Sequence, residues 1–172
     1  MNKYTIINET EFLKARDKIK KAQKEGKFII FSSRDDELNR KVLEKEKIDV
    51  LLLSLSKRKD FQKQRNSGFN QVMAKLAQKK KIIIGIDIDE IIKAEKKEKI
   101  EILARIRQNI KICKKNKIRM IFFSEKYQNE YNLKSLGLVL GMPTWMTKNL
   151  ILKNEEQSKD RDLEILLTIK FF

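Results

Sequence analysis

The sequence predicts an α/β fold in which parallel strands are covered by outer helices. Two observations indicate this class: short β-branched runs recur along the chain, and an amphipathic stretch follows each of the first four. Repeated β-α units favour a parallel sheet, because each helix carries the chain back to the starting edge of the sheet. The 172 residues fit one domain better than two, so we expect a single domain over residues 1–172.

The expected strands are runs of Ile, Leu, Val and Phe with the length and composition of buried strands. They are Tyr4–Asn8, Phe28–Ser33, Asp49–Leu55, Lys81–Ile88 and Arg119–Glu125. Helices are expected between these strands, where apolar residues recur every three or four positions. They are Glu9–Glu25, Asp35–Lys47, Phe69–Lys79 and Glu90–Lys115.

The helix expected to end at Lys115 has a clear apolar stripe. We expect the stripe to pack on the core and to include Cys113 as a small buried residue. Its members are Ile100, Leu103, Ile106, Ile110 and Cys113.

The last part of the chain predicts shorter elements. Leu133–Leu140 is expected to be a short helix, and a second short helix is expected over about 143–150. Residues 153–161 form a charged connector that we expect to be a mobile loop. Residues 163–169 have the composition of a last strand.

The charge of the chain indicates a polyanionic partner. Lys and Arg total 40 against 24 Asp and Glu, which leaves a formal net charge of +16. A coding bias toward Lys would enrich Glu as well, so the excess of bases favours nucleic acid, with an anionic membrane surface as the rival. No apolar run approaches the roughly 20 residues needed to cross a bilayer. We therefore expect no membrane-spanning segment, and we expect nucleic acid in preference to a membrane as the partner.

The chain contains no histidine and only one cysteine. This composition excludes Ser-His and Cys-His nucleophile systems, His-ligated zinc and thiolate metal sites. A single cysteine cannot form an internal disulfide and fits a reducing cytosol. An enzyme of this composition would have to work with carboxylates, Lys, Tyr or Ser. We expect a cytoplasmic protein.

The most basic candidate site is Lys57–Gly68 (KRKDFQKQRNSG), which follows the third expected strand. Ligands of parallel α/β proteins gather at the carboxyl ends of the strands. Asn66 or Ser67 can cap the helix expected from Phe69, whose free N–H groups attract anions. Gly68 would let a ligand approach the backbone closely. The alternative is a solvated loop with an ordinary helix cap.

A pair of carboxylates, Asp87 and Asp89 in the sequence GIDIDE, suggests a competing function. Strand alternation would place both side chains on one side of a strand end, where Mg²⁺ could bind as in phosphohydrolases with an Asp-x-Asp motif. Glu90 and Ile91 follow in place of the residues usual in that motif, and no further acidic cluster supplies ligands. Capping of the next helix or pairing with Lys is the alternative.

Three segments of the chain carry motif-like sequences, in the order RNSGFNQVMAKLA (65–77), ARIRQNIKICKKNK (104–117) and SLGLVLGM (135–142). Together they resemble the archaeal and eukaryotic RNase P protein component 3 family. Residues 65–77 (RNSGFNQVMAKLA) are similar to the family's Arg-Asn-Ser-Gly-Leu-Asn-His-Val-Leu signature, with Gln71 in place of the usual His. Residues 104–117 (ARIRQNIKICKKNK) resemble its Ala-Arg-Ile-x-Gln-Asn helix. Residues 135–142 (SLGLVLGM) resemble its Ser-Leu/Phe-Gly-Leu-Val-Leu-Gly-Met segment. The three segments lie within about half of the chain.

The resemblance implies a TIM-like barrel, which we expect to be open or reduced because only five or six strands can be read. It also implies an RNA-binding subunit of ribonuclease P that supports RNA-catalysed removal of the 5′ leader from pre-tRNA. Mg²⁺ would then serve the RNA, and the chain itself would carry no catalytic residue and bind no metal or cofactor. Pre-tRNA would be contacted indirectly. The expected partners are RNase P RNA and RNase P protein component 2. A purely structural, protein-binding subunit is the alternative.

The residues expected to contact RNA are basic or polar side chains near the ends of the strands and on the last long helix. They are Arg34, Lys57, Arg58, Lys59, Lys63, Arg65, Asn66, Ser67, Arg107 and Lys111. Arg65 is expected to hold a phosphate through two parallel hydrogen bonds, and Phe61 to stack on a base. Trp145 and Met146 are expected either at the surface for the protein partner or in the core.

Overall fold

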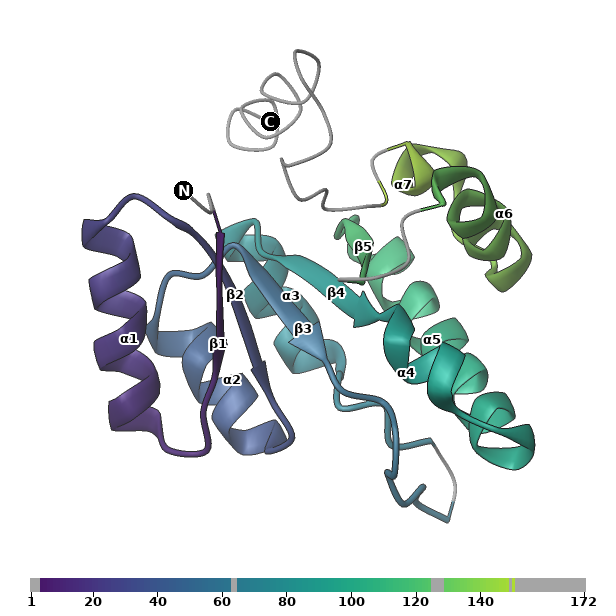
Figure 1. The fold of residues 1–172 in the computed structure, drawn as a ribbon, viewed down its shortest axis with the longest axis horizontal. Coiled ribbons are helices and arrows are strands. Elements are labelled where there is room, and N and C mark those ends of the chain that lie inside the picture. The colour runs from purple at the N-terminus through teal and green to yellow at the C-terminus, as the bar shows by residue number, and fades with distance from the viewer. Residues whose placement is uncertain (1–3, 63–64, 125–128, 149, 151–172) are drawn as a thin grey trace.

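The computed structural model describes residues 4–62, 65–124, 129–148 and 150. Its centre is a sheet of five parallel strands that lie side by side in chain order (Figure 1). The strands are β1 (Tyr4–Asn8), β2 (Phe28–Ser33), β3 (Val50–Leu53), β4 (Ile83–Asp87) and β5 (Met120–Phe123). All five expected strands are confirmed, with shorter bounds for the last three.

Seven helices are assigned within the described residues. They are α1 (Phe12–Lys24), α2 (Asp36–Lys45), α3 (Gln71–Lys80), α4 (Ile88–Lys93), α5 (Lys96–Lys115), α6 (Glu130–Leu140) and α7 (Thr144–Thr147). Each of these helices contributes buried residues to one large core cluster, which also contains one face of the sheet. Right-handed crossovers between adjacent parallel strands place all their helices on that one side.

The two faces of the sheet therefore form separate apolar clusters. Phe31 and Leu51 point from their strands into the cluster that contains the helices. Ile30, Val50 and Ile121 alternate with them and belong to a second, smaller cluster on the opposite face. Helices on a single face are typical of a barrel wall, whereas a doubly wound sheet carries helices on both faces. The sheet is open, because β1 and β5 are its two ends, so the expected open, barrel-like α/β fold is confirmed.

The prediction of a single helix over Glu90–Lys115 is wrong in two respects. Two helices occupy this stretch, and they are separated at Ala94 and Glu95. No glycine or proline marks the break in the sequence, and the backbone instead turns at Lys96, whose φ is +40°. The first of the two helices begins at Ile88, where the sequence predicted the end of a strand.

The expected apolar stripe of this segment is only partly correct. Ile106, Ile110 and Cys113 are buried, but Ile100 is 67% exposed. The buried side of α5 contains Arg105 and Asn109 in its place, with exposed fractions of 1% and 0%. Because two of the buried residues are polar, the spacing of the apolar residues alone does not show which side of α5 is buried.

Several other expectations concern the core and the end of the chain. Cys113 is a core residue as expected, and burial raises the pKa of its thiol, so it is not a reactive thiolate. The two short helices of the last part are confirmed as α6 and α7. Residues 153–161 and 163–169 lie outside the described residues. None of the helices in the described ranges combines the length and apolar character needed to cross a membrane.

Candidate nucleic-acid interface

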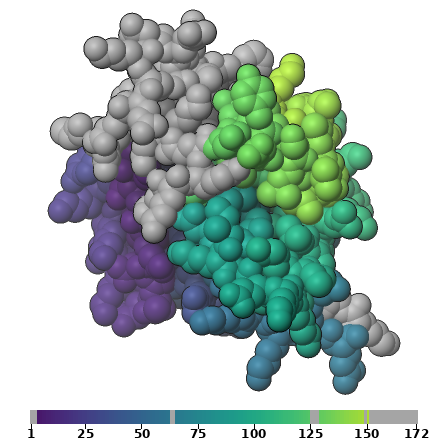
Figure 2. Space-filling model, turned by 45° about the vertical axis from the view of Figure 1, so that its right-hand side comes forward, coloured from purple at the N-terminus to yellow at the C-terminus, as the bar shows by residue number. Residues whose placement is uncertain are grey.

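The connection between β3 and α3, residues 54–70, is the candidate site and is called the β3–α3 loop below. Figure 1 shows that it extends beyond the end of β3, and in Figure 2 it lies at one edge of the molecule. Its described residues are 54–62 and 65–70. Exposed cations in this loop can present a fixed pattern to a ligand only if the loop backbone has a defined shape.

A buried guanidinium from α5 holds the first half of the loop. Arg105 donates from Nη1 to the carbonyl oxygen of Leu55 at 3.0 Å and from Nη2 to that of Arg58 at 2.8 Å. It also donates from Nε and Nη2 to Oδ1 of Asp60, at 3.1 and 3.0 Å. A buried charge is tolerated only with such partners, so this part of the loop and Arg105 stabilise each other.

Asp60 joins the two halves of the loop. Its carboxylate accepts hydrogen bonds from the backbone N–H of Asn66 at 2.9 Å and from Nη1 of Arg65 at 3.1 Å, besides those from Arg105. Partial burial alone would raise the pKa of Asp60, but the hydrogen bonds from Asn66 and Arg105 outweigh it and hold the pKa below its usual value. Asp60 therefore stays ionised and keeps the loop closed at neutral pH.

Arg58 is a structural residue of the loop, although we predicted contact with RNA. Its guanidinium makes two 2.8 Å hydrogen bonds to the carboxylate of Asp36 in α2 and a third, at 3.2 Å, to Oδ1 of Asn66. Its side chain is 9% exposed. A guanidinium occupied in this way has little capacity left for a phosphate.

The roles expected for Gly68, Asn66 and Ser67 are wrong in detail. Gly68 has a φ of +67°, and a Cβ built there would lie 2.4 Å from Nη2 of Arg58, so the glycine makes room for that guanidinium and not for a ligand. The cap of α3 is Asn70, whose side chain accepts from Met73 N–H at 3.0 Å. Ser67 is 2% exposed and donates to the Phe69 carbonyl oxygen.

Polar side chains of α5 hold the second half of the loop. Gln108 donates to the carbonyl oxygen of Arg65 and to Oγ of Ser67, both at 3.2 Å. Asn109 donates to the carbonyl oxygen of Ser67 at 3.4 Å. Two segments that resemble the family, 65–77 and 104–117, are thus in direct contact. Arg105, Gln108 and Asn109 were not identified as site residues from the sequence. Their position within segment 104–117, which resembles the family, is the feature that could have identified them.

Four of the cations that were predicted to contact RNA are accessible near the ends of β2 and β3. Lys57, Lys59 and Arg65 are exposed on the loop, and Arg34 is exposed just beyond β2. Phe61 lies among the loop cations and is 60% exposed. Lys63 lies outside the described residues. RNA contact by these side chains stays a prediction.

Arg107 and Lys111 do not join this group. The helical period places both on a different side of α5 from Arg105, which faces the loop. Arg107 instead donates to the carbonyl oxygen of Val139 in α6 at 3.5 Å. Both side chains are exposed, so they belong to a separate part of the basic surface.

The geometry assumed for an Asp87–Asp89 metal site is wrong. Asp87 ends β4 and caps α4 by accepting from the N–H of Asp89 at 2.8 Å, while Asp89 already lies in that helix and accepts from Oγ of Ser124 at 2.8 Å. The two carboxylates therefore serve different partners. No cluster of three or more Asp, Glu, Cys or His side chains suited to a metal ion occurs in the described part of the chain.

The sequence matches the family model described as RNase P subunit p30 over residues 5–157. The chain belongs to the RNase P subunit p30 family. The family match includes all five strands and the β3–α3 loop. It confirms the resemblance found in the three sequence segments.

Individual relatives agree with this membership. Ribonuclease P protein component 3 of Methanococcus maripaludis strain C7 is 23% identical over 168 residues, which cover 98% of this chain and 68% of the relative. The protein of the same name from Methanocaldococcus jannaschii is 27% identical over 138 residues, which cover 77% of this chain and 57% of the relative. The chain thus spans between about half and two thirds of these relatives.

A solved structure shares the fold. A chain of the cryo-EM structure of archaeal ribonuclease P with mature tRNA matches with a TM-score of 0.71 and 20% identity, over 95% of this chain and 65% of that chain. The match extends over nearly all of this chain, so the open parallel sheet with outer helices is the fold of that part of the relative.

We expect Arg105→Ala to destabilise the fold strongly, because it leaves two loop carbonyl oxygens without their donor. It also takes the buried guanidinium away from Asp60, which among the described residues keeps only the hydrogen bonds from Arg65 and Asn66. Removal of one partner of a buried ion pair costs about 3–5 kcal/mol. The control is Arg107→Ala, an exposed arginine on the same helix, for which a change within about 0.5 kcal/mol is expected. Urea unfolding measures both variants, and equal losses of stability would contradict the structural role of Arg105.

Proposed function

We propose that the chain is an RNA-binding subunit of ribonuclease P and supports RNA-catalysed removal of the 5′ leader from pre-tRNA. The observation that carries the proposal is the β3–α3 loop, in which a buried arginine fixes the backbone that presents Lys57, Lys59 and Arg65. Membership of the RNase P subunit p30 family supports it, as does the fold shared with a chain of archaeal ribonuclease P bound to mature tRNA.

A loop that is ordered before binding suits contact with a sugar–phosphate backbone. Phosphate contacts determine where a protein sits on a nucleic acid, and their geometry is lost if the cations move independently. Because Arg105 and Asp60 close the loop within the folded chain, binding does not have to order its backbone again. The exposed cations then release counterions from the RNA, which makes the affinity depend on salt.

The proposed subunit leaves the cleavage chemistry to the RNA. The chain lacks histidine, and its two candidate carboxylates serve different partners, since Oδ1 of Asp87 caps α4 and Asp89 accepts from Ser124. Phosphodiester cleavage by the RNA depends on Mg²⁺ that the RNA holds, so we propose no catalytic residue and no metal ligand in this chain. Pre-tRNA would then meet the protein only through the assembled particle.

We also propose RNase P protein component 2 as the protein partner, bound at the exposed apolar side chains of α6 and α7. Leu138 and Val139 are 49% and 72% exposed on α6, and Trp145 is 44% exposed on α7. Met146 is 2% exposed and belongs to the core, so it contributes no contact surface. Exposed apolar side chains that lie close together are typical of protein interfaces, and tryptophan is prominent among their strongest contacts.

The test of RNA binding compares two double variants that remove the same charge. Lys59→Ala with Arg65→Ala removes two loop cations, and Lys20→Ala with Lys24→Ala removes two exposed cations of α1. We expect only the loop variant to bind RNase P RNA more weakly and to lower the log–log salt slope, by about 0.7–0.9 for each lost phosphate contact. Filter binding across a salt series measures both quantities.

Equal weakening by both double variants would mean that net charge alone drives binding, and would contradict the loop as the site. The same assay with tRNA and with duplex DNA separates an RNase P subunit from a general polyanion binder. No affinity for RNase P RNA at moderate salt would leave only the alternative of a structural, protein-binding subunit.

The partner surface is tested with two matched substitutions of exposed valines. Val139→Asp places a charge in the proposed interface, and Val72→Asp places the same charge on α3, where Val72 is 52% exposed. We expect Val139→Asp to weaken binding of the cognate component 2 by at least about tenfold and Val72→Asp to leave it unchanged. Isothermal titration calorimetry measures the difference, and equal affinities of the two variants would contradict the assignment.

A further inference from the structure

A polar cavity of about 210 Å³ opens at the carboxyl ends of the first four strands. Its size is below the roughly 300–1,000 Å³ of sites for drug-sized ligands, so it has room for one small ring system. The first three strands contribute Asn8, Ser32 and Leu52, and the fourth contributes Asp87. The rest of the lining comes from Arg34, Leu53, Ser54 and Glu90. The family match and the loop described above assign no role to this cavity.

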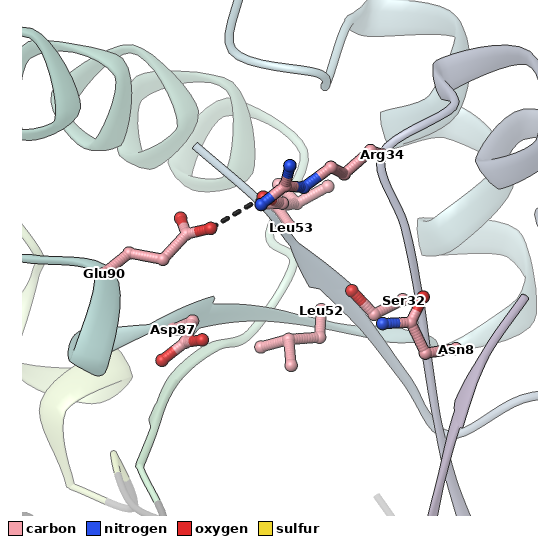
Figure 3. Close-up of a pocket in the computed structure, with 8 residues that line it drawn as sticks. Asn8, Ser32, Arg34, Leu52, Leu53, Asp87 and Glu90 are labelled. Carbon is pink, nitrogen blue, oxygen red and sulfur yellow. Dashed lines mark hydrogen bonds between the residues drawn. The ribbon is translucent and has the colours of Figure 1, made fainter. Parts of the chain in front are cut away.

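The walls of the cavity differ in chemistry. Figure 3 shows the two carboxylates, Asp87 and Glu90, on one side and the neutral polar side chains, Asn8 and Ser32, on the other. Leu52 lies between them and supplies an apolar surface. A flat molecule that rests on Leu52 would therefore meet hydrogen-bond acceptors along one edge and groups that both donate and accept along the opposite edge.

The carboxylate of Glu90 is already occupied. Its Oε1 accepts from Oγ of Ser54 at 2.6 Å and from Oγ of Ser56 at 3.0 Å. Its Oε2 accepts from the N–H groups of Leu55 at 2.6 Å and of Ser56 at 3.2 Å. Glu90 thus fixes the first residues of the β3–α3 loop against the cavity, which places the cavity directly beside the loop.

Asp87 is the acceptor that remains for a ligand. Its Oδ1 caps α4, and none of the described residues donates a hydrogen bond to Oδ2. Burial raises the pKa of this carboxyl, with smaller contributions from the nearby carboxylates, so its ionised form is poorly stabilised in the free protein. A donor supplied by a ligand would stabilise that form.

Arg34 provides a cation at the same cavity. Its side chain is exposed, and it forms no ion pair with another described residue. A guanidinium in this state can hold a phosphate through two parallel hydrogen bonds. A divalent cation fits less well, because Arg34 would repel it and the oxygens of Glu90 are taken.

We propose that this cavity receives one unpaired nucleobase that carries an amino group, with the phosphate of the same nucleotide on Arg34. The base would lie on Leu52, its amino group would donate to Oδ2 of Asp87, and its other edge would meet Asn8 and Ser32. Proteins read single-stranded RNA in this way, by hydrogen bonds to splayed-out bases and by contact with their faces. The proposal rests on the proposed function and adds a base-specific contact to it.

Cytidine and uridine 5′-monophosphates provide a matched pair of probes, because uracil has a carbonyl oxygen where cytosine has its amino group. We expect the full chain to bind CMP about tenfold more tightly than UMP, the effect of one hydrogen bond to a charged acceptor. Chemical-shift perturbation in NMR measures both affinities and reports whether Asn8, Ser32 and Asp87 respond. Equal affinities for CMP and UMP, or shifts only elsewhere, would overturn the proposal.

Asp87→Asn tests the acceptor. Asparagine also caps helices, so α4 is expected to remain intact, and a melting temperature no lower than that of the wild type verifies the fold. The preference for CMP over UMP should disappear in this variant. It should persist in the control Asp17→Asn, which changes a carboxylate of α1 that is 73% exposed. Persistence of the preference in Asp87→Asn would overturn the proposal.

Short single strands show whether the nucleotide belongs to RNA or is free in solution. We expect UUCUU to bind more tightly than UUUUU and to compete with CMP. Binding of CMP without binding of either oligonucleotide would contradict an RNA ligand and assign the cavity to a free nucleotide. Affinity for RNase P RNA, measured separately, tests the proposed function, so failure of one proposal is distinguishable from failure of the other.

Discussion

The candidate interface depends on the hydrogen bonds that one buried guanidinium, that of Arg105, makes with the β3–α3 loop. Arg105 is 1% exposed, and its hydrogen bonds go to Leu55, Arg58 and Asp60 of the β3–α3 loop. If the loop moved away from α5, the charge of Arg105 would be left buried without a partner. The conformation of the loop is therefore tied to the stability of the core. A segment rich in lysine and arginine would otherwise repel itself and sample many conformations.

The acidic residues explain how so basic a loop can be closed. Asp36 neutralises Arg58, Asp60 pairs with Arg65 and Arg105, and Glu90 holds the beginning of the loop. Each is placed by a different part of the fold: α2, the loop itself and α4. Lys57 and Lys59 face solvent, while Arg65 both pairs with Asp60 and stays 45% exposed, so it belongs to the closure of the loop and to its accessible cations. The cavity beside Glu90 extends the same surface to a contact that distinguishes bases.

The sequence predicted the fold well because its strands are continuous apolar runs and its helices keep a regular period. It located the loop correctly as the basic segment after β3. It could not show that Arg58 is largely buried while Lys57 and Lys59 are exposed. The burial of Arg58 depends on its pairing with Asp36, which is distant in the sequence. The break before α5 and the burial of Arg105 and Asn109 were missed for a related reason, since both follow from tertiary contacts that override local propensity. Asp89 was predicted to share a strand end with Asp87, but it lies in α4, which begins one residue before it.

The most direct test of the account is the affinity of Arg105→Lys for RNase P RNA at fixed salt. Lysine keeps the charge but cannot supply the fan of donors that holds Leu55, Arg58 and Asp60. At a temperature where both proteins are folded, we predict that binding weakens by about tenfold because the loop is released while net charge is unchanged. An affinity equal to that of the wild type would show that charge alone determines binding, and would contradict the account.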